Sequence, residues 1–449
     1  MTNKNTSVGV LGAGISGLSA AYALKKKGIS FTVYEKSDAV GGVIQSKRQN
    51  GWLVEEGPNT LMVKSDALWN LLDELDLDDQ ILEANPLAKK RYIVKNRQLE
   101  PLPSSLASFL KTPLLSPAAK LRLLKEPFVP SSVLNDESVA SFIERRLGRQ
   151  PLDYAVNPFI SGIYAGDPGR LSIKHTFEAL WKMEQEYGSL FKGWLKSERP
   201  KASKRKLISF KKGIQALPLA LAEKLSGSVL TSTEVTSIQK EGEQWQVSGS
   251  SKGDSFARNH DCLISTLPAH SLSEIFKSTL FDELENLPYA PVSSVALGFE
   301  NDQIHHPLDG FGMLIPEAED FKTLGVLFSS TLFPDRSPGG HSLLSCFIGG
   351  ARNPEWALKS TDELTNRLLE ELNQLLGITG EPVFVHRKFW TKAIPQYEVG
   401  YDYFLSLFKD IEKENRGLYL DGSFRSGVSV PDCISSGFET AQKAAMFLR

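Results

Sequence analysis

The glycine-rich segment near the N-terminus constrains the fold of this chain more than any other feature. An apolar run at residues 8–11 breaks at Gly12–Gly17 (GAGISG), and a run without charge then continues to residue 24. Three lysines and a glycine at 25–28 end that run, as is common at a helix C-terminus. A second apolar run follows at 31–34. The pattern predicts a strand, a tight turn, a helix and a second strand, which is the first half of a dinucleotide-binding domain.

The spacing of the glycines and of one acidic residue indicates a dinucleotide ligand. Gly12 permits the tight turn, Gly14 lets the backbone approach a pyrophosphate, and Gly17 lets the helix pack against the strand. Free N–H groups at a helix start favour an anion. Glu35 follows Gly17 by 18 residues, near the spacing of about 20 for a carboxylate that binds ribose hydroxyls. An acid here disfavours a 2′-phosphate, so the pattern favours FAD or NAD over NADP.

A second glycine pair favours FAD over NAD. Val40-Gly41-Gly42 follows Glu35 closely. After the first glycine motif, this segment resembles the second glycine motif of flavin amine oxidases and their relatives, in which backbone wraps the FAD diphosphate. Those proteins often carry arginine after the glycine pair. This chain has Val43 there, so a guanidinium–phosphate contact is not assumed.

Composition argues against several other classes of protein. The chain has 449 residues, with 51 Lys and Arg against 53 Asp and Glu and a net charge of −2. Nucleic-acid-binding domains are usually basic, so we expect no nucleic-acid partner. Cys262, Cys346 and Cys433 are far apart and offer neither a disulfide framework nor a paired metal motif, which fits a reducing compartment. No carboxylate or cysteine pattern around His175 or His305-His306 indicates a metal site.

The uncharged run between Lys4 and Lys25 has some features of a secretory signal. It contains four glycines and three serines, however, and no small-residue cleavage pattern follows it. No other window offers the roughly 20 apolar residues of a membrane-spanning helix. We therefore expect a cytoplasmic protein without a signal peptide.

The middle of the chain predicts a helical insert. Residues 65–82 have leucines at helical spacing, with Ser65 as a candidate N-cap. Residues 104–190 are rich in Leu, Phe and Ala at helical intervals and are broken repeatedly by proline, which predicts several short helices. The run Lys196–Lys212 carries eight basic residues and one acid. Such a run is typical of a solvated loop, and contact with an anionic membrane surface is the alternative.

The remainder predicts a mixed sheet and then a return to the dinucleotide-binding domain. Segments typical of strands lie at 229–233, 235–240, 245–250, 262–267, 293–299, 324–328 and 343–347, and helical patterns cover 213–225 and 360–376. Residues 417–422 predict a late strand running into a loop, and 430–448 predict a helix. In a FAD protein such a strand, loop and helix commonly return to the flavin ring, with the positive end of the helix dipole facing it.

Nearly the whole chain, in order, resembles the protoporphyrinogen oxidase family, which comprises FAD enzymes of haem biosynthesis within the flavin amine oxidase superfamily. The most specific segments are AGDP at 165–168, LFPDR at 332–336 and KAIPQY at 392–397. The other segments that carry the resemblance are Glu56–Thr60, Lys90–Ile93, Asn157–Leu171, Phe210–Pro218, Gly310–Pro316, Leu324–Asp335, Phe347–Pro354 and Gly422–Gly437.

The resemblance implies a fold and a set of cofactor contacts. The fold is α/β, mixed α+β in detail, with a Rossmann-like FAD-binding domain, a mixed-sheet substrate domain and a helical insert. Val235 would contact the adenine through its backbone. By position, the residues expected to contact FAD are Gly12, Ala13, Gly14, Ile15, Ser16, Gly17, Glu35, Gly42, Val43, Gly57, Pro58, Asn59, Thr60, Val235, Ser423, Val428, Ser429 and Val430.

The resemblance also implies contacts with a tetrapyrrole substrate. Arg91 would pair with a propionate, Leu314 and Leu327 would cover one face of the ring, and Phe347 would cover the other. A flat apolar macrocycle with carboxylates suits aliphatic and aromatic walls and a guanidinium. From residue type alone, the three apolar residues would be ordinary core residues and Arg91 a surface cation.

The reaction that the resemblance implies is the oxidation of protoporphyrinogen IX to protoporphyrin IX. Three hydride transfers to the flavin, each with loss of a pyrrole N–H proton, would remove six electrons, and O2 would reoxidise the flavin to give hydrogen peroxide. Because the flavin supplies the chemistry, no catalytic side chain is assigned, and a base could be a backbone carbonyl or a water near Gly166-Asp167. The alternatives are oxidation of coproporphyrinogen III to coproporphyrin III, another flavin amine or polyene oxidase, and a non-catalytic nucleotide-binding protein.

The expected domains interleave along the chain. We expect the FAD-binding domain at 1–84, 203–268 and 402–449, the helical insert at 85–202 and the substrate domain at 269–401. The expected partners are the porphyrinogen and O2. The insert is a candidate for peripheral contact with the inner membrane, and a homodimer is compatible with the resemblance.

Overall fold

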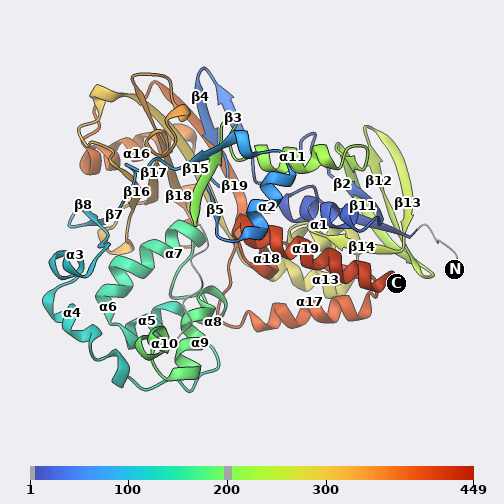
Figure 1. Ribbon diagram of the computed structural model, residues 1–449, viewed down its shortest axis with the longest axis horizontal. Coiled ribbons are helices and arrows are strands. Elements are labelled where there is room, and N and C mark those ends of the chain that lie inside the picture. The colour runs from blue at the N-terminus through green and yellow to red at the C-terminus, as the bar shows by residue number, and fades with distance from the viewer. Residues whose placement is uncertain (1–5, 197–204) are drawn as a thin grey trace.

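The computed structural model describes residues 6–196 and 205–449 (Figure 1). Within these residues, a five-stranded parallel sheet has the order β10-β2-β1-β14-β20. The start, middle and end of the chain all contribute strands to this sheet. Its strands are β1 (Ser7–Leu11), β2 (Ser30–Tyr34), β10 (Val229–Leu230), β14 (Cys262–Ser265) and β20 (Leu418–Leu420).

Helices α1 (Ile15–Lys26) and α19 (Val430–Phe447) lie side by side against this sheet (Figure 1). Gly437 of α19 is so close to α1 that a Cβ there would stand 2.4 Å from the Ser16 carbonyl oxygen. Helix α11 (Ala216–Lys224) packs on α1. Because α1 and α19 each follow a strand of the parallel sheet, both helix N-termini lie at the carboxyl ends of the strands, where such sheets bind ligands.

An antiparallel meander and several helices form a second hydrophobic core with Leu11 and Leu263 of the sheet. Trp245 and Phe408 are buried in this core. Its elements are β11 (Thr233–Glu241), β12 (Gln244–Ser251), β13 (Asp254–His260), α12 (Leu272–Phe276), α13 (Thr279–Asp282) and α17 (Asp402–Glu414).

A second large sheet has seven strands in the order β19-β15-β18-β17-β16-β7-β8. Helix α16 (Thr361–Leu376), which begins with a capping box between Ser360 and Glu363, packs its leucines on one face of this sheet over Val326 and Cys346. The strands are β7 (Lys90–Lys95), β8 (Gln98–Pro101), β15 (Tyr289–Glu300), β16 (Gly310–Leu314), β17 (Thr323–Phe328), β18 (His341–Gly349) and β19 (Phe384–Pro395).

Two small sheets connect the large ones. Trp52 and Val54 pack on the seven-stranded sheet, whereas Leu61, Leu72 and Ile208 join the core of the FAD-binding sheet. The small sheets contain β3 (Ser46–Gln49) with β4 (Trp52–Glu55), and β5 (Leu61–Val63), β9 (Lys206–Phe210) and β6 (Ile81–Glu83), with α2 (Asp66–Glu74) between β5 and β6.

A group of short helices, here called the insert (residues 106–196), lies to one side of the molecule (Figure 1). Its core contains Phe142, Ile160 and Ile173. Its helices are α3 (Leu106–Lys111), α4 (Pro117–Leu123), α5 (Val139–Arg146), α6 (Arg149–Pro151), α7 (Asn157–Tyr164), α8 (Ile173–Thr176), α9 (Glu178–Tyr187) and α10 (Leu190–Lys196), with a π-helical turn at Leu152–Val156.

Most elements predicted from local patterns are present, including the helix that Ser65 caps by accepting from the Leu68 N–H. The predicted insert at 85–202 differs at its start, because residues 90–101 form β7 and β8 of the seven-stranded sheet. Part of the Lys196–Lys212 basic run lies outside the described residues. In the part of the chain that the structure describes, no helix combines the length and the apolar composition needed to span a bilayer.

Candidate functional site

The segment Gly12–Gly17 runs from the carboxyl end of β1 into the first turn of α1, and Gly12 and Gly17 stand where another residue would be strained or would clash. Gly12 has a φ of +93°, and a Cβ on Gly17 would stand 2.1 Å from the Gly12 carbonyl oxygen. In contrast, a Cβ on Gly14 would meet no described atom within 4 Å, and among the described residues no side chain caps the first amides of α1. The loop is therefore open above Gly14, and the α1 amides can bind an anion such as a pyrophosphate.

Glu35 lies beside this loop at the end of β2. Its Oε2 accepts from the Ala13 N–H and its Oε1 from the Ser37 N–H, each at 2.9 Å. A carboxylate oxygen has two lone pairs, so ribose hydroxyls can still donate to this carboxylate. The Thr233 N–H donates to the Glu35 carbonyl oxygen at 2.8 Å, which places Val235, the predicted adenine contact, two residues further along β11.

Two more turns extend the open loop toward the seven-stranded sheet. A Cβ on Gly42 would stand 3.3 Å from the Gly14 Cα, and a Cβ on Gly57 would stand 2.0 Å from the Val43 carbonyl oxygen. The Val43 side chain is 48% exposed. The backbones at Gly14 and Gly42 are therefore in close contact, as are those at Val43 and Gly57.

The N-terminus of α19 converges on the same region. Ser429 caps it by accepting from the Asp432 N–H at 3.3 Å. The Tyr397 hydroxyl donates to the Ser423 carbonyl oxygen and accepts from the Gly427 N–H at 3.1 Å. Tyr397 thus holds the segment that was predicted to meet the flavin, which includes Val428 and Val430.

Three predicted substrate residues lie on one face of the seven-stranded sheet, here called the Leu314 face and defined by Leu314, Leu327 and Phe347. Leu314 pairs with Gly325, and Gly325 pairs with Phe347. Leu327 lies two residues from Gly325 and therefore on the same face. All three are partly exposed, whereas Met313 and other residues that alternate with them are buried under α16. Gly325 has no side chain, and the Leu314 side chain lies over it, with Cδ2 2.9 Å from where a Cβ would stand.

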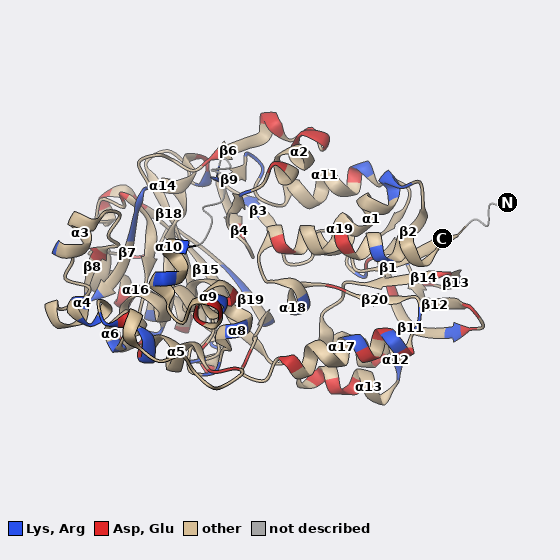
Figure 2. Ribbon diagram, turned by 60° about the horizontal axis from the view of Figure 1, so that its bottom comes forward, with Lys and Arg blue, Asp and Glu red and all other residues tan. Residues whose placement is uncertain are grey.

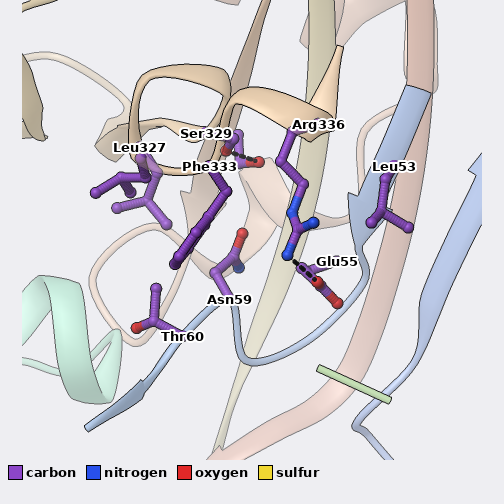
Figure 3. A pocket seen from close by; sticks show the side chains of 10 residues that line it. Leu53, Glu55, Asn59, Thr60, Leu327, Ser329, Phe333 and Arg336 are labelled. Atoms are coloured by element: carbon purple, nitrogen blue, oxygen red, sulfur yellow. Dashed lines mark hydrogen bonds and ion pairs between the residues drawn. The ribbon is translucent and has the colours of Figure 1, made fainter. Parts of the chain in front are cut away.

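The turn at residues 57–60 meets the Leu314 face. Strand β4 packs Trp52 against Gly298, on the same side of the sheet as Leu327. A small cavity of about 10 Å³ lies between Asn59, Thr60 and Leu327 (Figure 3), which is room for about one water molecule. The structure therefore brings the predicted cofactor turn, including Gly57 and Pro58, to the predicted substrate residues.

Arg91 lies further along the same sheet. It is opposite Gly312 of β16, and its guanidinium carbon is 5.3 Å from the centre of the Phe311 ring. Gly312 in turn pairs with Leu327. The side chain of Arg91 is exposed, so it is free to bind a carboxylate at the edge of the Leu314 face. The individual FAD and substrate contacts stay predictions.

A charged cluster beside the 57–60 turn was not predicted from the sequence. The Glu56 carboxylate is 2.8 Å from His386 Nε2 and 3.3 Å from Lys388 Nζ, and the Trp390 indole N–H donates to the Glu56 carbonyl oxygen at 2.7 Å. Lys388 continues the row of Leu314, Gly325 and Phe347 through Ser294 of β15. The side chains of β19 alternate in exposure only in part, so the sequence pattern gave little indication of this strand or of the cluster on it.

We expect the chain to lose stability as the pH falls from about 6.5 to about 4. Burial lowers the pKa of His260 to about 4; Arg258 adds to this effect and Asp261 opposes it. His260 Nε2 is 2.7 Å from the Tyr34 hydroxyl. In this pH range the unfolded chain binds a proton at His260 and the folded chain does not, so acid favours unfolding. Urea unfolding at pH 7 and pH 5 should show a smaller loss of stability in His260→Gln than in the wild type; equal losses would contradict this role.

Comparisons with known proteins agree with this arrangement. A family model described as flavin containing amine oxidoreductase matches residues 15–445. The chain is 37% identical to protoporphyrinogen oxidase 2, chloroplastic/mitochondrial, of Arabidopsis thaliana, over 98% of this chain and 94% of the plant protein. It is 28% identical to coproporphyrinogen III oxidase of Bacillus subtilis, over 100% of both. A crystal structure from Exiguobacterium sp. 255-15, provisionally assigned as a protoporphyrinogen oxidase, has the same fold, with a TM-score of 0.83 at 23% identity over 100% of this chain and 99% of that one.

The open glycine loop, the Glu35 carboxylate and the two converging helix N-termini define a dinucleotide-binding oxidoreductase. The chain belongs to the flavin-containing amine oxidoreductase family, and within it to the protoporphyrinogen oxidases. Its cofactor is FAD. The residues present fit this group, because the loop has free amides and space above Gly14. Among residues 6–196 and 205–449, no three His, Cys, Asp or Glu side chains are grouped as metal ligands.

Proposed function

We propose that this chain oxidises protoporphyrinogen IX to protoporphyrin IX in haem biosynthesis, with O2 as the electron acceptor and hydrogen peroxide as the second product. The observation that carries the proposal is the meeting of the 57–60 turn with the Leu314 face (Figure 3). The aliphatic and aromatic surface beside the expected flavin position supports the proposal, and so does the relation of the chain to protoporphyrinogen oxidases over nearly its full length.

The residues of this chain bind the cofactor and the substrate, orient them, and exclude water. The α1 amides bind the pyrophosphate, and Glu35 accepts from the ribose hydroxyls. Leu314 and Phe347 align a flat apolar ring, and Arg91 binds a propionate at the edge of the face. When bound, FAD supplies the hydride-accepting chemistry, so no side chain must act as a nucleophile. The apolar walls keep bulk water away from the reacting carbons.

Oxidation of coproporphyrinogen III is the second candidate function. The observation that favours it is the similarity to the Bacillus subtilis coproporphyrinogen III oxidase, which extends over all of both chains. That substrate carries two more propionates than protoporphyrinogen IX and therefore needs more cationic partners. The 37% identity to the Arabidopsis protein favours the first candidate.

Anaerobic flavin reduction tests the proposal. Purified holoenzyme should lose its flavin absorbance band at ~450 nm when protoporphyrinogen IX is added without oxygen. It should recover the band, with formation of peroxide, when air is admitted. Coproporphyrinogen III serves as the parallel substrate. If only coproporphyrinogen III bleaches the flavin, the second candidate is correct; if neither does, both are wrong.

Substituting Arg91 should weaken substrate binding more than it slows the reaction. We expect Arg91→Ala to raise KM about 10-fold, or roughly 1.4 kcal/mol, with kcat changed less than about threefold, because the guanidinium anchors a propionate away from the reacting carbon. Lys90→Ala is the matched control, since Lys90 is the preceding residue of β7 and pairs with Asp309. An unchanged KM in Arg91→Ala would remove this residue from the site.

We propose further that the insert contacts an anionic membrane surface. Large apolar side chains are exposed along it, among them Phe128 and Leu124 at 86% and 71%. Lysine and arginine side chains lie nearby on α4 and α6 (Figure 2). Exposed apolar groups combined with basic residues favour binding to anionic lipid. The homodimer stays a prediction.

Vesicle sedimentation tests the membrane contact. The wild type should pellet with phosphatidylglycerol-containing vesicles, and Leu124→Ser with Phe128→Ser should pellet at least about fivefold less. Met446→Ser is the control, because Met446 is also exposed but lies near the C-terminus, on the other side of the molecule from the insert (Figure 1). Equal sedimentation of all three proteins would contradict the proposal.

A further inference from the structure

A buried arginine joins the two halves of the site. Arg336 lies in the connection between β17 and β18, after α14 (Ser329–Leu332), and its side chain is 2% exposed. Its Nη2 donates to Ser209 Oγ at 2.6 Å and to the Phe210 carbonyl oxygen at 3.3 Å. It also donates to Glu55 Oε1 at 3.4 Å (Figure 3). One side chain from the β17–β18 connection of the seven-stranded sheet thus reaches the ends of β4 and β9.

Glu55 collects further contacts from the FAD-binding side. Its Oε1 accepts from the Ile214 N–H at 3.0 Å, and its Oε2 accepts from the Ser46 hydroxyl. Ser46 Oγ accepts in turn from the Gln215 N–H at 3.1 Å. A Cβ on Gly213 would stand 2.3 Å from Ser46 Oγ, so this turn closes tightly on the carboxylate.

Gln215 extends the network to the second glycine turn. Its Nε2 donates to Gln45 Oε1 at 2.7 Å. Gln45 Nε2 donates to the carbonyl oxygens of Val40 and Gly42 at 3.2 and 3.1 Å. The backbone carbonyl oxygen of Gln45 accepts from the Glu56 N–H at 2.9 Å. The network therefore runs from the glycine turn to the β17–β18 connection and passes the base of the 57–60 turn.

The charges in this network depend on each other. Burial raises the pKa of Glu55 to about 7, although Ser46, Arg336 and the Ile214 N–H act to lower it. Burial also lowers the pKa of Arg336, against Glu55 and Asp335. Removing Arg336 would leave the buried Glu55 without a cation, which is far more costly than removing both residues. Removing Glu55 would leave Arg336 with Asp335, whose Oδ1 is 3.0 Å from the Arg336 Nη1.

We infer that Arg336 and Glu55 are a positioning pair that fixes the 57–60 turn to the Leu314 face and thereby sets how the bound flavin meets the porphyrinogen. This inference rests on the proposed function. Four segments that carry the family resemblance, the second glycine pair, FKKGIQALP, EGPNT and LFPDR, meet at this network. The pair connects these segments. Neither residue needs to touch flavin or substrate to hold the 57–60 turn and the Leu314 face in position.

Three variants test the pair: Arg336→Met, Glu55→Gln and the double variant. Arg336→Met should lower kcat about 10- to 100-fold, with KM changed less than about threefold, and should alter the visible circular dichroism of the bound flavin. The double variant should regain thermal stability, because no buried charge is left unpaired, yet its kcat and flavin spectrum should stay altered because the connection is lost. If kcat and the spectrum recover together with stability, the pair is only structural and the inference is wrong.

Arg367→Met is the matched control. Arg367 bonds to the buried Glu371 at 2.7 Å under the opposite face of the same sheet, so its loss should lower stability without altering the flavin spectrum or kcat. If Arg336→Met does not fold, the kcat and the flavin spectrum of the double variant alone test the inference. The flavin spectrum is recorded without substrate, so it tests the positioning role of the pair even if porphyrinogens fail to reduce the wild-type flavin. That failure would overturn only the proposed function.

Discussion

Gly17→Ala should yield a protein that purifies without flavin. The alanine Cβ would stand 2.1 Å from the Gly12 carbonyl oxygen and 2.7 Å from Thr266 Oγ1. A backbone oxygen cannot rotate away as a side chain can, so the loop must open and the α1 amides leave their positions under the pyrophosphate. We expect FAD affinity to fall at least about 100-fold.

The ratio of flavin to protein absorbance after purification, followed by titration of the apoprotein with FAD, measures this loss. Gly339→Ala is the control, because a Cβ there would meet no described atom within 4 Å and the position has an ordinary φ. Full flavin content in Gly17→Ala would contradict the placement of the pyrophosphate at this loop. Far-UV circular dichroism separates loss of flavin from loss of the fold.

Arg146→Met should destabilise the insert more than any surface change. The Arg146 side chain is fully buried and bonds to Glu184 at 2.6 Å and to Glu126 at 3.1 Å. It also donates to the carbonyl oxygens of Val129 and Gly188. Without Arg146, the buried Glu126 loses its cationic partner and Glu184 keeps Arg145, and we expect the free energy of unfolding to fall by about 3–5 kcal/mol.

Urea unfolding followed by tryptophan fluorescence, to which Trp181 of α9 contributes, measures this change. The control is Arg149→Met, which removes an exposed pair with Asp153 four residues away and should cost no more than about 0.5 kcal/mol. Equal losses of unfolding free energy in the two variants would show that the buried contacts of Arg146 do not stabilise the insert.

Local patterns predicted the FAD-binding side of the molecule well. The strand at 8–11, the glycine turn, the helix ending at the lysines and the helix beginning at Val430 are all present. These elements depend on contacts between near neighbours: a cap, a positive φ or a run of apolar side chains. The strands β7 and β8 were not predicted, although they pair with each other as a local hairpin. The hairpin belongs to the large sheet only because β7 also pairs with β16, more than 200 residues later.

The sequence by itself predicted that this chain binds a dinucleotide, since the positive φ of Gly12 and the close contact of Gly17 with the Gly12 carbonyl oxygen need glycine, and Gly14 leaves space for a ligand. Only the tertiary structure decided that Leu314 and Phe347 share one face with Gly325 between them. The same holds for Arg336 and Glu55, which are 281 residues apart. The physical reason is that side chains alternate between the two faces of a strand, so a shift of one residue in register would move each of these walls to the other side of the sheet.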